Sequence, residues 1–154
     1  MSRSQIADHL QELGELYAAH SVARPAEQVW RSQAFLQRLL TDMRRPGFAL
    51  VVAENTALTA CAYGFPLREG LMEIREIVVP RRVREQSQGR DWNLARRLQR
   101  RLLDDHGHAT GLTLVDRTDV RALAALRSWG WRDTPATPYG IPLLDPRCAL
   151  LLGR

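Results

Sequence analysis

The stretch from Ile74 to Leu103, IREIVVPRRVREQSQGRDWNLARRLQRRLL, decides the predicted fold. It starts as an apolar strand that ends at Pro80 and continues as a polar loop. It closes as a helix with leucines at 94, 98 and 102, and Asp91 stands at the expected N-cap. The first N–H groups of a helix lack helical partners and lie at the positive end of its dipole. The segment therefore predicts a diphosphate-binding turn.

Arginines crowd this segment. They stand at positions 81, 82, 84, 90, 96, 97, 100 and 101. A guanidinium presents a planar fork of donors that suits phosphate and does not lose its charge. A solvated helix face is the alternative explanation, and for any single arginine it is the simpler one.

Hydrophobic periodicity predicts the remaining elements. Helices are expected over 5–19, from Pro25 to a helix end at residues 45–47, and over Val120–Trp129. The last of these is expected to be capped by Thr118 or Asp119 and to end at Gly130. Strands are expected over Phe48–Glu54, Leu58–Phe65, Leu71–Val79, Gly111–Val115 and from Cys148, with a turn over Pro66–Gly70. This order predicts an α/β fold of the α+β type, with a mixed central sheet and helices on both faces.

Composition limits the function classes. The chain has 154 residues, 45% of them hydrophobic, and a net charge of +5, and all 22 basic residues are arginine. One domain over residues 1–154 is expected, and disorder is disfavoured. No apolar stretch is long enough to span a bilayer and no signal peptide is visible, so we expect a cytoplasmic protein with no membrane partner. Cys61 and Cys148 are interpreted as reduced core residues.

The start of the central helix resembles the acetyl-CoA motif of the GCN5-related N-acetyltransferases (GNAT), Arg/Gln-x-x-Gly-x-Gly/Ala. Residues 90–95, RDWNLA, match its first and last positions, with Asn93 in place of the first glycine. Residues 86–91, QSQGRD, keep that glycine but put Asp91 in the last small position. We prefer the register that starts at Arg90, because it aligns the leucines and asparagine tolerates positive φ.

The carboxyl half is similar to the same family. Its Asn-x-x-Ala helix start corresponds to residues 119–122, DVRA, and its Tyr-x-x-x-Gly-Phe ending corresponds to residues 126–131, LRSWGW. Asparagine has become Asp119 and tyrosine has become Leu126. The resemblance runs over roughly residues 10–152, and the family's usual first strand is expected to be missing.

The resemblance implies a function. The chain would transfer an acetyl group from acetyl-CoA, its co-substrate, to an amine of a small molecule or a peptide. The implied coenzyme A contacts are Ile77, Val78, Val79, Arg90, Asp91, Trp92, Asn93, Leu94, Ala95 and Arg96. The implied catalytic candidates are Glu76 as base, Glu73 as its substitute, and Tyr139 as proton donor in place of the missing tyrosine. Because side chains alternate along a strand, Glu73 and Glu76 are expected on opposite faces.

Other functions stay open. The alternative is a catalytically degenerate member of the family, which binds coenzyme A or a protein partner without acetyl transfer. It is favoured by three residues that depart from the family pattern, Asn93, Asp119 and Leu126. A nucleic-acid module is disfavoured, because no zinc spacing and no RNA-binding aromatic motif is found. No metal site is expected, since His106 and His108 fit helix-end charge balancing better. The tail strand suits a homodimer, but the sequence leaves the acceptor and the oligomeric state open.

Overall fold

The computed structural model describes residues 1–20, 24–54, 56–80, 90–134 and 147–153. Its helices are α1 (Arg3–Asp8), α2 (Leu10–Ala19), α3 (Pro25–Asp42), α5 (Arg90–Asp104) and α6 (Val120–Ser128). Its strands are β1 (Ala49–Glu54), β2 (Leu58–Arg68), β3 (Leu71–Val78), β4 (Thr110–Asp116), β5 (Arg132–Asp133) and β6 (Arg147–Leu152). None of the helices in these ranges is both long and apolar enough to cross a membrane.

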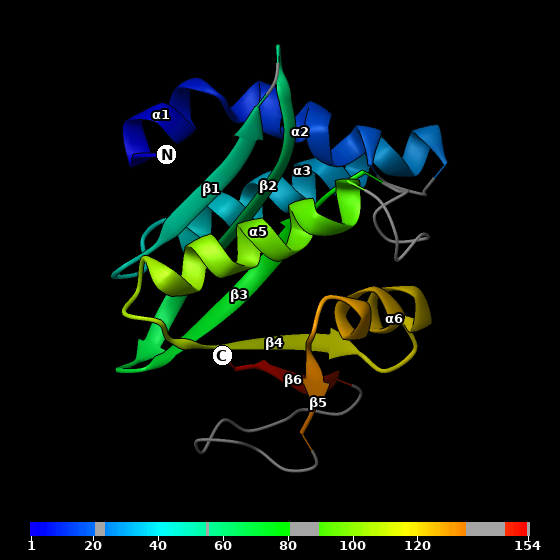
Figure 1. The fold of residues 1–154 in the computed structure, drawn as a ribbon. Coiled ribbons are helices and arrows are strands. Elements are labelled where there is room, and N and C mark those ends of the chain that lie inside the picture. Colours follow the sequence, from blue (N-terminus) through cyan, green and yellow to red (C-terminus); the bar gives the residue numbers. More distant parts are fainter. Residues whose placement is uncertain (21–23, 55, 81–89, 135–146, 154) are drawn as a thin grey trace.

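The strands form one mixed sheet in the order β1-β2-β3-β4-β6-β5 (Figure 1). Strands β3 and β4 run parallel, whereas the other neighbours run antiparallel. The strand predicted from Cys148 is confirmed as β6, which lies between β4 and the two-residue β5. The sequence did not predict β5, because two residues are too few to show a period.

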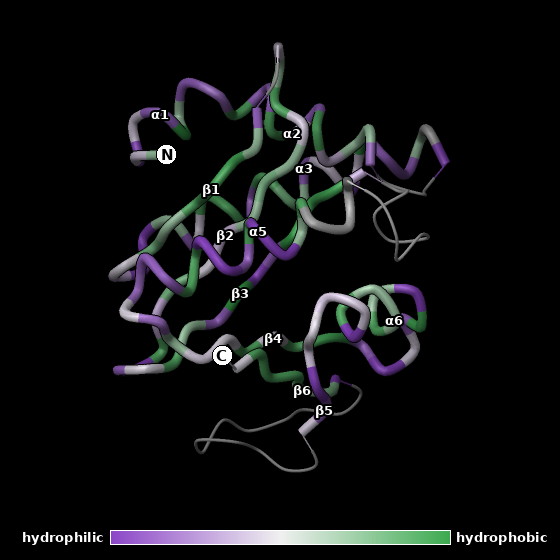
Figure 2. The backbone as a smooth tube through the Cα atoms, in the orientation of Figure 1, coloured by the Kyte–Doolittle hydropathy of each residue, from purple (hydrophilic) through white to green (hydrophobic). Residues whose placement is uncertain are grey.

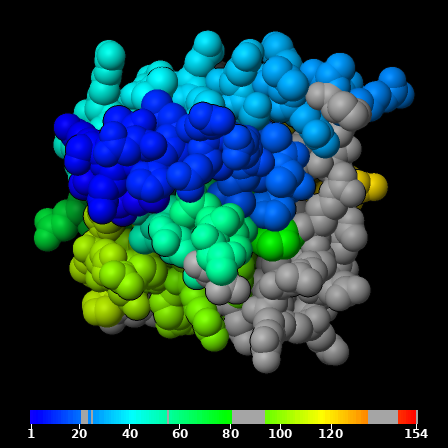
Figure 3. Space-filling model, turned by 90° about the horizontal axis from the view of Figure 1, so that it is seen from above, coloured from blue at the N-terminus to red at the C-terminus, as the bar shows by residue number. Residues whose placement is uncertain are grey.

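Helices cover both faces of the sheet, as predicted. Alternation along β2 sends Cys61 and Tyr63 into a core with α1–α3, while Ala60 and Ala62 face a second core under α5 and α6. Figure 3 shows the residues of α1–α3, in blue and cyan, gathered over one side of the molecule. Figure 2 shows hydrophilic residues recurring along α5, whereas the strands are mainly hydrophobic.

The helix predicted over 5–19 is two helices, which corrects the sequence-based expectation. Ser2 and Gln5 form a capping box that starts α1, and the chain turns at His9, where φ is −113° and ψ is 14°. The His9 ring donates from Nδ1 to the Gln5 carbonyl at 2.7 Å, which holds this bend. The break brings Ile6 and Leu13 into the same core, both fully buried.

Strand β2 also departs from the prediction, because it continues through Pro66 to Arg68. Pro66 has no N–H to donate, so it is tolerated only where a strand edge lacks a partner or the ladder is irregular. Both conditions hold: β1 pairs with β2 only as far as Gly64, and the register to β3 shifts between Pro66 and Arg68.

The helix α5 buries the predicted leucine stripe. Leu98 and Leu102 are buried and Leu94 is half-buried, whereas Arg97, Arg100 and Arg101 are exposed on the outer face. This part of the arginine cluster is therefore a solvated helix face. The helix begins at Arg90, so Asp91 lies inside its first turn and not at the predicted cap position.

A buried hydrogen-bond chain attaches the carboxyl half to α5. Gln99, 3% exposed, donates from Nε2 to the Trp129 carbonyl at 2.8 Å, and Trp131 donates from Nε1 to Gln99 Oε1 at 2.9 Å. Gly130 between them has φ +101°, a conformation that favours glycine. This chain fixes α6 next to α5 and thereby positions one wall of the site.

Candidate functional site

A cleft opens because β3 and β4 pair only at their beginnings. The parallel ladder runs from Leu71↔Thr110 to Glu73↔Leu112 and then stops. Beyond it, β3 stays with β2 as far as Val78, and β4 stays with β6 as far as Asp116. One edge of β3 after Glu73 therefore has no ladder to β4 among the described residues, and it faces the space between the two strands.

A β-bulge in β3 bends the strand at this point. Tyr63 pairs with Glu76 and Gly64 pairs with Ile74, so Arg75 has no partner in the ladder. A bulge bends its strand and increases the local twist, which moves β3 away from β4. Gly64 permits the close approach, because a Cβ at this position would lie 2.2 Å from the Glu73 carbonyl oxygen.

The bulge also corrects the prediction that Glu73 and Glu76 face opposite sides. The extra residue shifts the alternation by one, and both carboxylates lie on the α3 side of the sheet. Glu76 accepts from Arg38 Nη2 at 3.0 Å. Glu73 accepts from Arg75 Nη1 at 2.7 Å.

Glu73 is held in a partly buried network and does not line the cleft. Arg75, which bonds to Glu73, also donates from Nε to Asp42 Oδ2 at 3.3 Å, and Tyr63 donates to the same oxygen at 3.1 Å. Glu73 is 6% exposed and Asp42 3%. Burial alone would lower the pKa of Arg75, but Glu73 and Asp42 more than offset this and raise it. The network braces the bulge against α3.

Glu76, in contrast, lines the cleft, and its carboxylate influences the groups around it. Burial alone would lower the pKa of Arg38, but Glu76 and Tyr17 raise it overall. Burial and then Glu76 raise the pKa of Cys61 to about 12, and burial, Glu76 and Asp42 raise that of Tyr63. The Glu76 side chain is 23% exposed, so its carboxylate lies between the strand interior and the open cleft.

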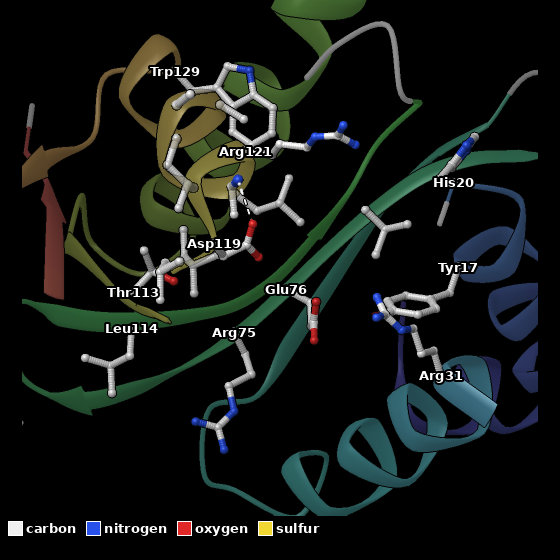
Figure 4. A pocket seen from close by; sticks show the side chains of 18 residues that line it. Tyr17, His20, Arg31, Arg75, Glu76, Thr113, Leu114, Asp119, Arg121 and Trp129 are labelled. Atoms are coloured by element: carbon white, nitrogen blue, oxygen red, sulfur yellow. Dashed lines mark hydrogen bonds between the residues drawn. The ribbon is translucent and has the colours of Figure 1, made fainter. Parts of the chain in front are cut away.

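The cleft has a volume of about 710 Å³ and two chemically different walls (Figure 4). Strand β3 supplies the floor with Ile74–Val78, and β4 supplies Thr113–Val115. One wall is formed by Tyr17, His20 and Arg31 from the α2–α3 region. The opposite wall comes from α6 and its flanks and consists of Asp119, Arg121, Ala122, Ala124, Ala125, Leu126 and Trp129.

The α6 wall is built by a cap and small residues. Asp119 Oδ1 accepts from the Ala122 N–H at 3.1 Å, which confirms the predicted N-cap. Ala122 and Ala125 project little side chain, so space remains along the wall. Leu126, at the position of the family's tyrosine, lies on this wall and carries no proton to donate.

Backbone and side-chain polar groups also line the cleft. Beyond Glu73, β3 forms no ladder to β4 among the described residues, although Ile77 is engaged in an interaction of its own. Trp129 also lines the cleft, and its buried indole Nε1 has no hydrogen-bond partner among the described residues. A buried donor without a partner is costly, and Figure 4 shows this nitrogen on the side of the indole that is turned away from Glu76.

The other predicted coenzyme A residues are distributed unevenly. Ile77 and Val78 line the cleft, whereas Val79 and Ala95 are buried in the α5 core. Arg96 donates from Nη2 to the Ser128 carbonyl at 3.0 Å, so it braces α6. Leu94 is half-buried on α5. The side chains of residues 90–93 and all of Tyr139 lie outside the described part of the chain, and the role of every residue in this set stays a prediction.

Sequence reasoning missed the α2–α3 wall. Tyr17, His20 and Arg31 precede the motif-bearing segment by more than 40 residues, and no local motif marks them. One signal was present, because Arg31, Arg38 and Asp42 recur at the helical spacing of the buried Phe35. Charged residues on the buried side of a helix often mark a polar site. Among the described residues, no group of three or more His, Cys, Asp or Glu is arranged to hold a metal ion.

No protein-family model matches the sequence, and no curated protein sequence matches it. Solved structures do match. The PaiA N-acetyltransferase of Thermoplasma acidophilum, in complex with coenzyme A, is 9% identical and covers 96% of this chain and 94% of its own, with a TM-score of 0.67. The ribosomal-protein-S18-alanine N-acetyltransferase of Escherichia coli is 16% identical, with coverages of 94% and 87% and a TM-score of 0.58.

A GNAT family acetyltransferase from Elizabethkingia anophelis, with acetyl-CoA bound, is 16% identical, with coverages of 80% and 84% and a TM-score of 0.55. At these identities the likeness concerns the arrangement of the backbone. The chain therefore has the fold of the GCN5-related N-acetyltransferases, as the resemblance of its motifs predicted.

Proposed function

We propose that this protein transfers an acetyl group from acetyl-CoA to an amine. The observation that carries the proposal is the cleft between the diverging ends of β3 and β4, with the Glu76 carboxylate on its floor. The bound acetyl-CoA would supply an activated thioester carbonyl. The likeness to acetyltransferases solved with coenzyme A supports this choice of ligand.

Coenzyme A would be held by two parts of the chain. The backbone of Ile77–Val79 would bond to the amides of the pantetheine arm, and the start of α5, from Arg90 to Arg96, would receive the diphosphate. The positive end of a helix contributes roughly 0.3–1 kcal/mol to such an anion. The small side chains of Ala122 and Ala125 leave room for the arm.

Glu76 would act as the general base. A lysine-like ammonium has a pKa of about 10.4, so the amine must lose a proton before its nitrogen can attack. Glu76 accepts that proton, while Arg38 holds the carboxylate in place. The amine nitrogen then bonds to the thioester carbonyl carbon, whose oxygen is met by a β3 N–H, and the carbon–sulfur bond breaks. Solvent or Tyr139 returns a proton to the sulfur, because Leu126 has none to give.

Calorimetry with acetyl-CoA tests the proposal. We expect saturable binding that raises the free energy of unfolding by about 2.7 kcal/mol at a ligand concentration 100 times Kd. Ala122→Leu places extra carbon atoms in the cleft and should weaken binding about 10-fold or more. Ala7→Leu, on the exposed side of α1, is the matched control and should bind normally. Absence of binding, or equal binding by both variants, would overturn the proposal.

One observation favours the second candidate, a GNAT-fold protein that binds coenzyme A or a protein partner without acetyl transfer. Leu126 fills the wall position where the family places its proton-donating tyrosine. The two candidates differ in turnover. Release of free thiol from acetyl-CoA in the presence of amines supports the transferase, whereas tight binding without thiol release across a broad amine panel supports the second candidate.

A further inference from the structure

The α3 helix presents a charged stripe to β3. Arg38 and Asp42 follow Arg31 by 7 and 11 residues. This helical spacing places all three on the same face of α3 as the buried Phe35. The last two are engaged by the bulged strand, since Arg38 bonds to Glu76 and Asp42 receives hydrogen bonds from Arg75 and Tyr63. Arg31 lies two turns nearer the helix start, where the stripe meets the open cleft.

Three arginines line the cleft: Arg75 on the β3 floor, Arg121 on the α6 wall and Arg31 on the wall that Glu76 faces. Among the described residues neither Arg31 nor Arg121 forms an ion pair, and of these two Arg31 is the one on the helical side toward which Glu76 projects. Arg75 is shared by two carboxylates and Arg38 is paired with Glu76. Arg31 forms no ion pair with any residue that the structure describes, and it lines the cleft. A guanidinium keeps its charge at every physiological pH and presents several donors in a plane. This wall therefore offers a guanidinium that is paired with none of the described carboxylates.

An aromatic pair lies on the same wall as Arg31. Tyr17 forms the wall beside Arg31, and its ring stacks on Phe35 with centroids 4.5 Å apart and planes 13° apart. Figure 4 shows Arg31 and Tyr17 on the helical side of the cleft and Glu76 projecting from β3 toward them. A molecule bound here meets a carboxylate at one end and a guanidinium at the other.

We propose that the acceptor is a small amino acid, whose amine faces Glu76 and whose carboxylate is bound by Arg31. This inference rests on the proposed function and names its substrate class. The cleft volume of 710 Å³ lies within the range of about 300–1,000 Å³ typical of small-molecule sites, and coenzyme A takes part of it. Opposite charges at the two ends match a zwitterion, whereas a peptide amino terminus has an amide in place of the carboxylate and leaves Arg31 unpaired.

The test compares each standard L-amino acid with its primary amide, which mimics a peptide amino terminus. Both are titrated by calorimetry into protein saturated with coenzyme A, so that no turnover occurs. At least one amino acid is expected to bind about 10- to 100-fold more tightly than its amide. This is the gain in affinity expected from charge-assisted hydrogen bonds between its carboxylate and Arg31. Arg31→Gln should remove this preference and leave the affinity for coenzyme A unchanged. Arg44→Gln, an exposed arginine outside the cleft, should keep both.

Each other outcome overturns the inference. Amides that bind as tightly as the acids indicate a peptide acceptor, and no binding by any amino acid excludes the class. Weaker coenzyme A binding by Arg31→Gln assigns the arginine to the cofactor. Failure of coenzyme A itself to bind removes the proposed function together with the inference, whereas normal coenzyme A binding without an acid preference removes the inference alone.

Discussion

Substitution of Gly64 by alanine should destabilise the strand pair that opens the cleft. Gly64 faces the bulge of β3, and an added Cβ would lie 2.2 Å from the Glu73 carbonyl oxygen and 3.1 Å from Ile74 Cα. Non-bonded carbon and oxygen atoms do not approach this closely, so the two strands must separate by about 1 Å. The obstructing atom belongs to the backbone, and no side-chain rotation can relieve the contact.

The magnitude follows from how firmly the obstructing strand is held. Glu73 is paired with Leu112 of β4 and bonded to Arg75, which resists displacement. Overpacking costs about 1–3 kcal/mol, and a rigid backbone neighbour favours the upper half of that range. Alanine gives back about 0.4–1 kcal/mol by restricting the unfolded chain. We therefore expect a net loss of about 2 kcal/mol, or roughly 4–8 °C in Tm for a chain of this length.

Urea unfolding followed by circular dichroism measures this loss of stability. The urea concentration at the midpoint should fall, while the dependence of the unfolding free energy on urea concentration stays unchanged. Gly153→Ala is the matched control, because a Cβ there meets nothing within 4 Å, and its stability should stay within about 0.5 kcal/mol of wild type. A Gly64→Ala protein as stable as this control would refute the steric argument and the geometry of the bulge with it.

Three further predictions concern the site and its supports. Glu76→Gln keeps the shape of the side chain but cannot take up a proton. The acetyl-transfer rate should therefore fall about 100-fold or more, while the Kd of acetyl-CoA stays the same. An unchanged rate would show that Glu76 is not the base. Burial and Glu76 raise the pKa of Cys61 from 9.0 to about 12, so its contribution to folding is present below pH 9 and lost as pH rises toward 12. Iodoacetamide at pH 9 should accordingly modify Cys148 but reach Cys61 only after unfolding, and equal labelling of the two thiols in mass spectra of the folded protein contradicts this. Gln99→Leu leaves two buried hydrogen-bonding groups unpaired and should cost about 2–4 kcal/mol in urea unfolding, and a loss below about 1 kcal/mol would show that the buried chain adds little.

Much of the fold could be predicted because it depends on local periods. The leucines of α5 recur every four residues, and Asp119 followed by a helical pattern marks the start of α6. The apolar run from Cys148 predicted the strand that became β6. Such signals act between residues a few positions apart, where the geometry of a helix or strand is set by the chain itself.

Long-range contacts decided where the predictions failed. Strand β2 continues through Pro66 because β1 has already ended, and that depends on where another strand stops. The helix expected over 5–19 bends at His9 because the bend lets both halves bury apolar residues in one core. Neither partner is near in sequence, so no window of local pattern contains the information.

The sequence by itself determined the order of helices and strands, the mixed sheet covered on both faces, and the likeness to the GNAT motifs around α5 and α6. Tertiary structure alone decided the site. One unpaired residue, Arg75, moves Glu76 to the same side as Glu73 and turns β3 away from β4, and only packing of α2 and α3 against that side brings Tyr17 and Arg31 to the cleft. The physical reason is that a bulge and a helix–strand contact are properties of pairs of segments, which form only when distant parts of the chain meet.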